Sequence, residues 1–420
     1  MNTKKIFNDI FFDDLTQNEK NILQTQSSRE LFVKIEIIDV SNDIVGEIAG
    51  RAINGNYNID NSASLRRTCS VTFLLETSDL ELDTLKSAFA INKKFILYVG
   101  LSQTGTNNVC WFNKGTYAIK DPNITVSINE QTITINGLDK MALHNGDISG
   151  QLEYATIIEV EEGVYVHDAV RAIMQDGGET KLDIAETKLL IPYKIESAIG
   201  DARYDVIEKL TNLFYNYQAY YNVGGTFVFA QKPTSANEGN DIAIDFGDKR
   251  WKNLIISIDR DIAYSNIKNK IVVYGGTHDD GYQPSYIIEV SDANYPSSPY
   301  TIDKLNEKHL DGSFIYRILV IQDDAYVDNG VAENANDNME EIHAYSIDLC
   351  KQRAESEVYL HQQATDTITI NCIPIYSLDV NEVIYLDDEQ SGVQGKYVVN
   401  NISCGLGASD TMTITANKLW

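Results

Sequence analysis

The stretch NDNMEEIHAYSIDLCKQRAESEVYLHQ at residues 336–362, followed by TITINCIP at residues 367–374, decides the fold. In the first part, apolar residues recur every three or four positions, which is the period of an amphipathic helix. That stripe consists of Met339, Ile342, Tyr345, Leu349, Cys350, Ala354 and Val358. In the second part, apolar and polar residues alternate, as in a half-buried strand. The sequence therefore predicts a helix of about seven turns that leads into a β-sheet.

The rest of the C-terminal part also reads as strands. After residue 374, alternation returns around Val383 and Tyr385, at 397–402 and at 412–416. Upstream, strands are predicted around residues 254–258 and 271–274. The stretch 275–334 is rich in turn residues, and we expect loops there with short strands at 287–288 and 314–316. Residues 241–420 are thus predicted to form a β-rich domain with a loop-rich insertion and one long helix.

The N-terminal part is predicted to be a second β-rich domain. Residues 1–30 are a polar extension in which Phe7, Ile10, Phe11 and Leu15 recur at helical spacing. From residue 31 the period changes to two, with half-buried strands around 33–37 and 69–73, whereas the continuously apolar run 95–99 is typical of a strand covered on both faces. A hairpin turn is expected at residues 129–130. Residues 31–145 therefore look like one antiparallel β-domain.

Residues 146–240 have a different pattern, typical of a small α/β module. A short helix is expected from Val166 to the glycine pair at 177–178, and a second helix begins near Asp201, a good N-cap residue type. A strand, a glycine turn at 224–225 and another strand follow. The fold class is therefore α+β, mainly β, with two β-domains flanking the module at 146–240.

Composition and charge exclude several functions. The 420 residues carry 61 acidic and 34 basic side chains, a net charge of −27. Nucleic-acid binding as the main activity is disfavoured because such domains are basic, and attachment to an anionic membrane is disfavoured for the same reason. The charge fits either simple solubility or a surface that must not hold DNA. The five cysteines, an odd number without C-x-x-C spacing, predict reduced, buried thiols.

The chain shows no targeting or membrane-spanning pattern. The N-terminus lacks the apolar core of a signal peptide, because Phe11-Phe12 is followed at once by Asp13-Asp14. No apolar run approaches the roughly 20 residues needed to span a bilayer. We therefore expect no membrane span, and we expect synthesis and folding in the cytoplasm.

No strong catalytic motif is present, so no catalytic, cofactor-binding or metal-binding residue is predicted. The best metal candidate is His278-Asp279-Asp280, which reads more simply as a solvated loop tip. The acidic runs at 279–281 and 387–389 lack the alternating spacing of a calcium loop and read as turns.

Tyrosine is abundant, and four tyrosines gather at the end of the second module helix: Tyr215, Tyr217, Tyr220 and Tyr221. They are compatible with a glycan- or protein-contact patch, since tyrosine offers amphipathic contact area. The alternative is that they pack in the core of the module.

The order of these elements resembles that of the phage baseplate hub family, also called tail-tip structural proteins. The matching segments are RRTCSVTF (66–73), YDVIEKL (204–210), YYNVGGTFVF (220–229), the long helix with TITINCIP, DVNEVI (379–384), GKYVV (395–399) and TMTITA (411–416). The family pattern favours a glycine before the strand at 383, where Asn381-Glu382 stand here. The resemblance covers most of residues 31–420.

The resemblance implies that residues 31–145 and 241–420 are two tube-like domains. Three copies would form a ring that presents six such domains to the six-fold tail tube. Its expected partners are the tail tube, tape measure and tip or spike proteins, together with other baseplate proteins. It would be made in the host cytoplasm, and its expected place is the tail baseplate of a virion or tail-like particle. The chain is then a structural protein and not an enzyme. The alternatives are an adhesin that binds cell-wall glycan and, less in keeping with the missing motifs, a peptidoglycan hydrolase.

Overall fold

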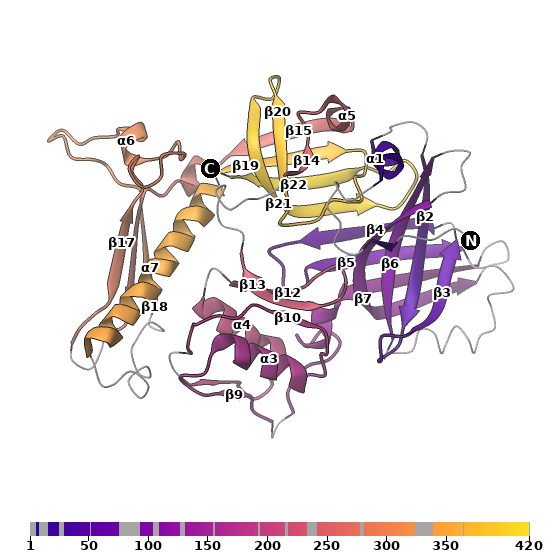
Figure 1. Ribbon diagram of the computed structural model, residues 1–420, viewed down its shortest axis with the longest axis horizontal. Helices are drawn as coiled ribbons and strands as arrows, with labels where there is room; N and C mark the ends of the chain where they lie inside the picture. Colours follow the sequence, from indigo (N-terminus) through magenta and orange to yellow (C-terminus); the bar gives the residue numbers. More distant parts are fainter. Residues whose placement is uncertain are drawn as a thin grey trace.

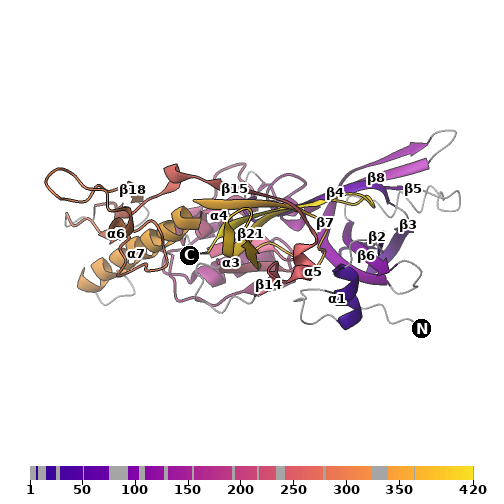
Figure 2. The same cartoon turned by 90° about the horizontal axis from the view of Figure 1, so that it is seen from above.

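The computed structural model is mainly β with a few helices (Figure 1). It describes residues 6–7, 16–24, 29–50, 52–74, 93–103, 109–126, 131–153, 156–191, 194–214, 217–232, 242–277, 281–323, 339–363 and 365–419. Seen from above, the molecule is elongated, with α7 (Met339–Gln363) toward one end and the strands that follow the N-terminus at the other (Figure 2).

A large sheet joins strands from both ends of the sequence. Its main path is antiparallel throughout, in the order β15-β19-β22-β21-β4-β5-β8-β7-β6-β2-β3. The first four strands are β15 (Ile255–Ile262), β19 (Asp366–Cys372), β22 (Met412–Lys418) and β21 (Val393–Gly405). The others are β4 (Ala52–Asp60), β5 (Arg67–Leu74), β8 (Gln131–Asp139), β7 (Val109–Val126), β6 (Lys94–Gln103), β2 (Arg29–Ile38) and β3 (Ile44–Gly50). β20 (Val383–Asp388) pairs with β21 and with β14 (Ile242–Asp245), and β1 (Ile6–Phe7) pairs with β7.

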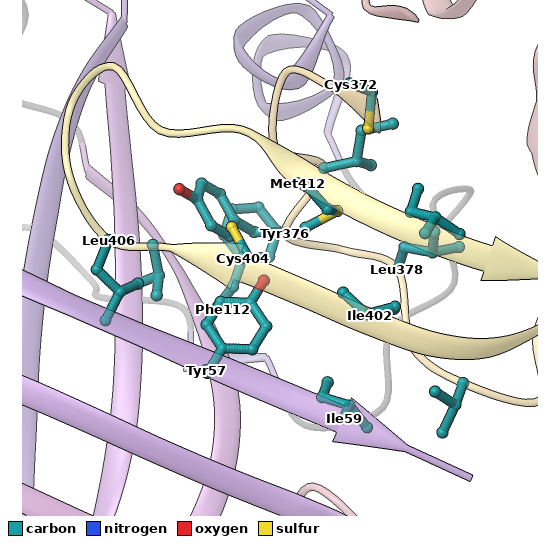
Figure 3. Packing of buried hydrophobic residues seen from close by; sticks show 14 of the residues in the cluster. Tyr57, Ile59, Phe112, Cys372, Tyr376, Leu378, Ile402, Cys404, Leu406 and Met412 are labelled. Carbon is teal, nitrogen blue, oxygen red and sulfur yellow. The ribbon is translucent and has the colours of Figure 1, made fainter. Parts of the chain in front are cut away.

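The two ends of the sequence meet where β4 pairs with β21. Ile59 lies opposite Ile402 and Tyr57 opposite Cys404, and all four side chains are buried. Figure 3 shows these four side chains in the core, with Tyr376 beside Cys404. Burying each large apolar side chain contributes about 1.5–3 kcal/mol, so this seam stabilises the contact between the N- and C-terminal strands.

Below the sheet in Figure 1, the chain from β9 to β13 forms a small helical and mixed-sheet region. It contains β9 (Glu159–Val160), α3 (Val166–Asp176), β10 (Leu182–Ile184), β11 (Ile195–Glu196), α4 (Arg203–Leu213), β12 (Tyr217–Tyr221) and β13 (Phe227–Gln231). α3 buries Val166, Val170 and Met174, the spacing of one helical face. This region is called the module below.

At the far end, three strands and α7 form an arm. The strand order is β17 (Ser285–Glu289), β16 (Lys270–Gly275), β18 (Ile318–Asp323), and α7 contacts β16 and β17. The stripe predicted for the long helix is confirmed at Leu349, Cys350, Ala354 and Val358, which are all buried. The short helices among the described residues are α1 (Gln17–Leu23), η3 (Lys140–Leu143), α5 (Lys249–Lys252), η4 (Tyr264–Asn266) and α6 (Ile302–Leu305).

Three local expectations were wrong. Phe7 lies in strand β1, paired with β7, and the helix of this region begins later, at Gln17; Ile10, Phe11 and Leu15 lie outside the described residues. The last insertion strand is β18, not residues 314–316, because parallel pairing with β16 starts at Ile318.

The third correction concerns the cap of α4. Asp201 is not its N-cap, because its carboxylate accepts the N–H of Ala198; Ala202 holds that position, and Asp205 accepts its N–H at 2.7 Å. The hairpin turn at 129–130 lies outside the described residues, although β7 and β8 pair on either side of it. The division at 31–145, 146–240 and 241–420 stays a prediction.

Candidate functional site

Two clusters of charged side chains are buried where other parts of the chain meet the large sheet. The first joins the module to the sheet through Lys140, which follows β8 and is 3% exposed. Its ammonium donates to Glu179 Oε2 at 2.5 Å and to the carbonyl of Gly225 at 2.8 Å. The hydroxyl of Tyr221 donates to the same Glu179 oxygen at 2.8 Å. These four residues are called the Lys140 cluster.

Gly225 allows this contact because no side chain stands in the way. Its φ is +74°, in the left-handed region, and a Cβ there would lie 2.8 Å from Cβ of Thr116 on β7. Only glycine reaches both that conformation and that closeness without strain. The turn between β12 and β13 can therefore lie directly on the sheet.

The charges of the Lys140 cluster are compensated. Burial alone would raise the pKa of Glu179, but the charge and hydrogen bond of Lys140 bring it below its usual range. His144, stacked on the Tyr221 ring, is 5% exposed, and burial lowers its pKa to about 4. The Lys140 cluster thus holds an ion pair, and the neutral imidazole of His144 lies beside it.

The second cluster, called the charged junction below, lies where the loop before β20 meets β5 and β7. Its members are Arg66, Arg67, Lys114, Asp139, Asp379 and Glu382. Both arginines, Lys114 and Asp139 are at most 4% exposed, whereas Asp379 and Glu382 are partly buried. Three basic and three acidic groups therefore lie together in one interior region.

One pair in the charged junction is close. Arg67 Nη2 lies 2.6 Å from Asp379 Oδ2. Arg66 uses neutral partners instead, donating to Asn61 and Gln218, and its guanidinium lies 3.6 Å from the centroid of the Tyr220 ring. Gln218 and Tyr220 belong to β12, so Arg66 ties the module to the sheet.

The remaining groups of the charged junction are not closely paired. Among the described residues, Lys114 and Glu382 have no oppositely charged group within 4.0 Å. The Lys114 ammonium faces the Tyr57 ring at 5.6 Å, and Glu382 Oε2 accepts the N–H of Asp379 at 2.8 Å. A buried charge without a close partner is unfavourable, which shifts both groups toward their neutral forms.

The pKa values follow this geometry. Burial lowers the pKa of Lys114 to about 8, while burial and the neighbouring charge of Asp379 raise the pKa of Glu382 to about 8. Burial likewise raises the pKa of Asp139 to about 6. For Asp379, burial would raise the pKa, but the charge of Arg67 lowers it below the usual range.

Asn381 explains a departure from the hub pattern. Its φ is +66°, and its side chain accepts from Asn61 at 2.7 Å. Asparagine tolerates this left-handed conformation better than other non-glycine residues. Asn381 can therefore stand where a glycine is favoured.

The candidates named from the sequence lie elsewhere. His278, Asp279 and Asp280 are outside the described residues. The run 387–389 lies at the end of β20, where Asp388 accepts from Ser391 and pairs with Lys252. In the part of the chain that the structure describes, no group of three or more His, Cys, Asp and Glu side chains is placed to hold a metal, and no helix is long and apolar enough to cross a membrane.

The tyrosine group packs inward. Tyr217 stacks on Phe229, Tyr221 belongs to the Lys140 cluster and Tyr220 carries Arg66 on its ring. Tyr215 lies outside the described residues. Of the two interpretations of these tyrosines, the positions of the three described ones favour core packing.

Comparison with solved structures identifies the fold. The crystal structure of the tail protein from Neisseria meningitidis MC58 aligns with 92% of this chain and 96% of its own, with a TM-score of 0.57 and 9% identity. The 43 kDa tail protein of prophage MuSo2 from Shewanella oneidensis aligns with 93% and 96%, with a TM-score of 0.52 and 12% identity. The chain has the fold of phage tail proteins. This confirms the resemblance at the level of the fold.

Other comparisons add less. The lidded PdpA-VgrG complex of Francisella contains a chain that aligns with 95% of this chain and 53% of its own, with a TM-score of 0.50 and 10% identity. A family described as a domain of unknown function (DUF5048) matches residues 329–420, which span α7 and β19 to β22. No curated protein matches the sequence significantly.

Proposed function

We propose that this protein is a structural baseplate hub of a phage tail or phage-tail-like particle. In this role three copies form a ring that adapts the six-fold tail tube to the central tip. The observation that best supports this proposal is the tail-protein fold. The alignment with the Neisseria tail protein covers 92% of this chain and 96% of that protein. The ring, its partners in the tail tube, tape measure, tip and other baseplate proteins, and its place in the baseplate belong to the proposal.

The large sheet offers surfaces for such a ring. Among the described strands, β3 and β15 each pair on one side only and lie at opposite ends of the path. Exposed apolar side chains stand on both, Ile44 at 61% and Ile256 at 59% exposure. A closed ring uses head-to-tail contacts between two different surfaces, and unpaired sheet edges are surfaces that proteins normally cover. Contact between β3 and β15 of neighbouring copies meets both requirements.

The acidic balance fits this proposal. A net charge of −27 keeps a ring around a DNA path from binding phosphates. It also opposes assembly, since Glu47 on β3 and Asp259 and Asp261 on β15 would approach one another across the contact. Added salt should favour the ring, because it screens charges beyond about 8–10 Å.

The test is the mass of the protein in solution across a salt series. We expect a species of three times the 47.0 kDa chain mass, alone at high salt or with the adjoining tail proteins. Ile44→Lys and Ile256→Lys should each abolish this species and leave the far-ultraviolet circular dichroism spectrum unchanged. Ile199→Lys, at a 68% exposed position in the module, is the matched control and should still assemble. A stable dimer under every condition, or trimers formed equally by both edge variants, would contradict the proposal.

A further inference from the structure

The charged junction joins segments that lie far apart in the sequence. Arg67 is the first residue of β5 and Arg66 directly precedes it, Lys114 belongs to β7, and Asp379 and Glu382 belong to the loop before β20. Asp139 is the N-cap of η3, and Arg66 reaches β12 in the module. Hydrogen bonds connect the loop at 379–382 to β5 through Arg67, and to the module through Asn61 and Arg66.

The loop at 379–382 is anchored in the main hydrophobic core by Val380, which is 6% exposed, and its polar contacts are few. Asp379 accepts from Arg67, Asn381 accepts from Asn61, and backbone hydrogen bonds join Asn381 and Glu382 to Val399 on β21. The Glu382 carboxyl turns back on its own loop, toward the N–H of Asp379. When Glu382 is ionised, two carboxylates lie on this short loop, and only Asp379 has a cation within 4.0 Å among the described residues.

We propose that the charged junction is a proton-controlled latch, which holds the loop at 379–382 against β5 and β7 and loosens as Glu382 ionises. The groups that face one another across it from the packed elements are Tyr57, Arg66, Arg67, Lys114, Tyr117, Asp139, Tyr220, Asp379, Glu382 and Cys404. The latch does not depend on the proposed hub function, since it concerns the chain by itself.

The direction of the response follows from proton binding in the closed and open loop. From about pH 4.5 to 8 the closed loop keeps the Glu382 proton that the open loop has lost, so the free energy of opening falls as pH rises. From about pH 8 to 10.5 the open loop keeps the Lys114 proton that the closed loop has lost, so the free energy of opening rises again. The loop should therefore be least protected near pH 8 and better protected on both sides. Asp139 adds to the first slope only below about pH 6.

Hydrogen–deuterium exchange measures this opening directly. Protection factors of peptides covering residues 375–386, corrected for the intrinsic exchange rate, are compared between pH 6 and 9.5. We expect protection to fall at least 5-fold from pH 6 to 8 and to recover above pH 8. Glu382→Gln keeps an oxygen to accept the Asp379 N–H and should abolish the fall, whereas Lys114→Met should abolish the recovery.

Two controls separate the latch from a general response to pH. Glu389→Gln removes an exposed carboxyl in the turn after β20 and should behave as the parent protein. For peptides that cover α7, the protection factor should show no minimum near pH 8. A flat profile in the parent, or the same minimum in Glu382→Gln, would overturn the latch. If a junction variant does not fold, the carboxyl carbon shift of Glu382 in the parent decides instead, with a midpoint above pH 6 supporting the latch and one near 4.5 overturning it.

Discussion

The Lys140 cluster and the charged junction both bury ions at the boundary of the large sheet, yet they hold them differently. In the Lys140 cluster, one ammonium has a carboxylate at 2.5 Å and a carbonyl at 2.8 Å. In the charged junction, one close pair lies beside Lys114 and Glu382, neither of which has an opposite charge within 4.0 Å in the described part. A buried charge with a close partner of opposite charge stabilises a contact, whereas buried charges without such a partner make the stability of the contact depend on pH.

The largest effect is expected at Lys140. Lys140→Ala leaves the Glu179 carboxylate buried without its cation, and should lower the free energy of unfolding by about 3–5 kcal/mol. Urea denaturation measures the change. Lys188→Ala, at an exposed position with no ion pair among the described residues, is the control and should change little. A loss below about 1 kcal/mol for Lys140→Ala would mean that the module is not fixed through this contact.

Breaking the close pair of the charged junction should cost less. Asp379 is 28% exposed and can be hydrated once its partner is gone, so Arg67→Ala should lower the free energy of unfolding by about 2–3 kcal/mol. A double-mutant cycle with Asp379→Ala separates the pair from other losses. The exposed pair of Arg171 and Asp168 provides the control cycle, with coupling of at most about 1 kcal/mol. Equal coupling in both cycles would remove the distinction between buried and surface pairs.

The two clusters should also respond to pH with opposite sign. His144 binds a proton below pH 6.5 when unfolded but only near pH 4 when folded, so acid weakens the contact beside Lys140. Between pH 6.5 and 4 the free energy of unfolding should fall by about 1–3 kcal/mol more in the parent than in His144→Gln. Replacing the exposed His309 by Gln should leave the acid response of the parent unchanged. An identical acid response in parent and His144→Gln would show that this imidazole is not buried as described.

The smallest effect is expected at Tyr220. Tyr220→Leu removes the ring beneath Arg66 but keeps an apolar side chain, and should cost about 0.5–1 kcal/mol in thermal unfolding. Tyr220→Phe retains the ring and should be close to neutral. If Phe costs as much as Leu, the contribution comes from the hydroxyl and not from the face of the ring.

Local elements could be predicted from the sequence because their periods are local. The stripe of Leu349, Ala354 and Val358 indicates α7, and alternation indicates β19 to β22. β1 was missed and β18 was misplaced because each is defined by pairing with a strand that is distant in the sequence. A period of two in the sequence does not show which distant strand will be the partner.

The seam and the charged junction could not be found in this way. Pairing of β4 with β21 joins residues about 350 positions apart, and no local pattern encodes it. Arg66, Arg67 and Asp379 stand in segments that carry the resemblance to hub proteins, but the pairing of Arg67 with Asp379 follows only from the sheet order. Adjacent arginines directly before an alternating strand, in a chain this acidic, are the one signal that pointed there.

Electron cryomicroscopy of the purified protein with its adjoining tail proteins tests the proposed hub most directly. We expect particles with three-fold symmetry in which β3 of one copy lies against β15 of the next and the strands around β5 and β21 form two similar units per copy around a central channel. Particles with two-fold symmetry, or three-fold particles in which β3 and β15 both remain exposed, would contradict it.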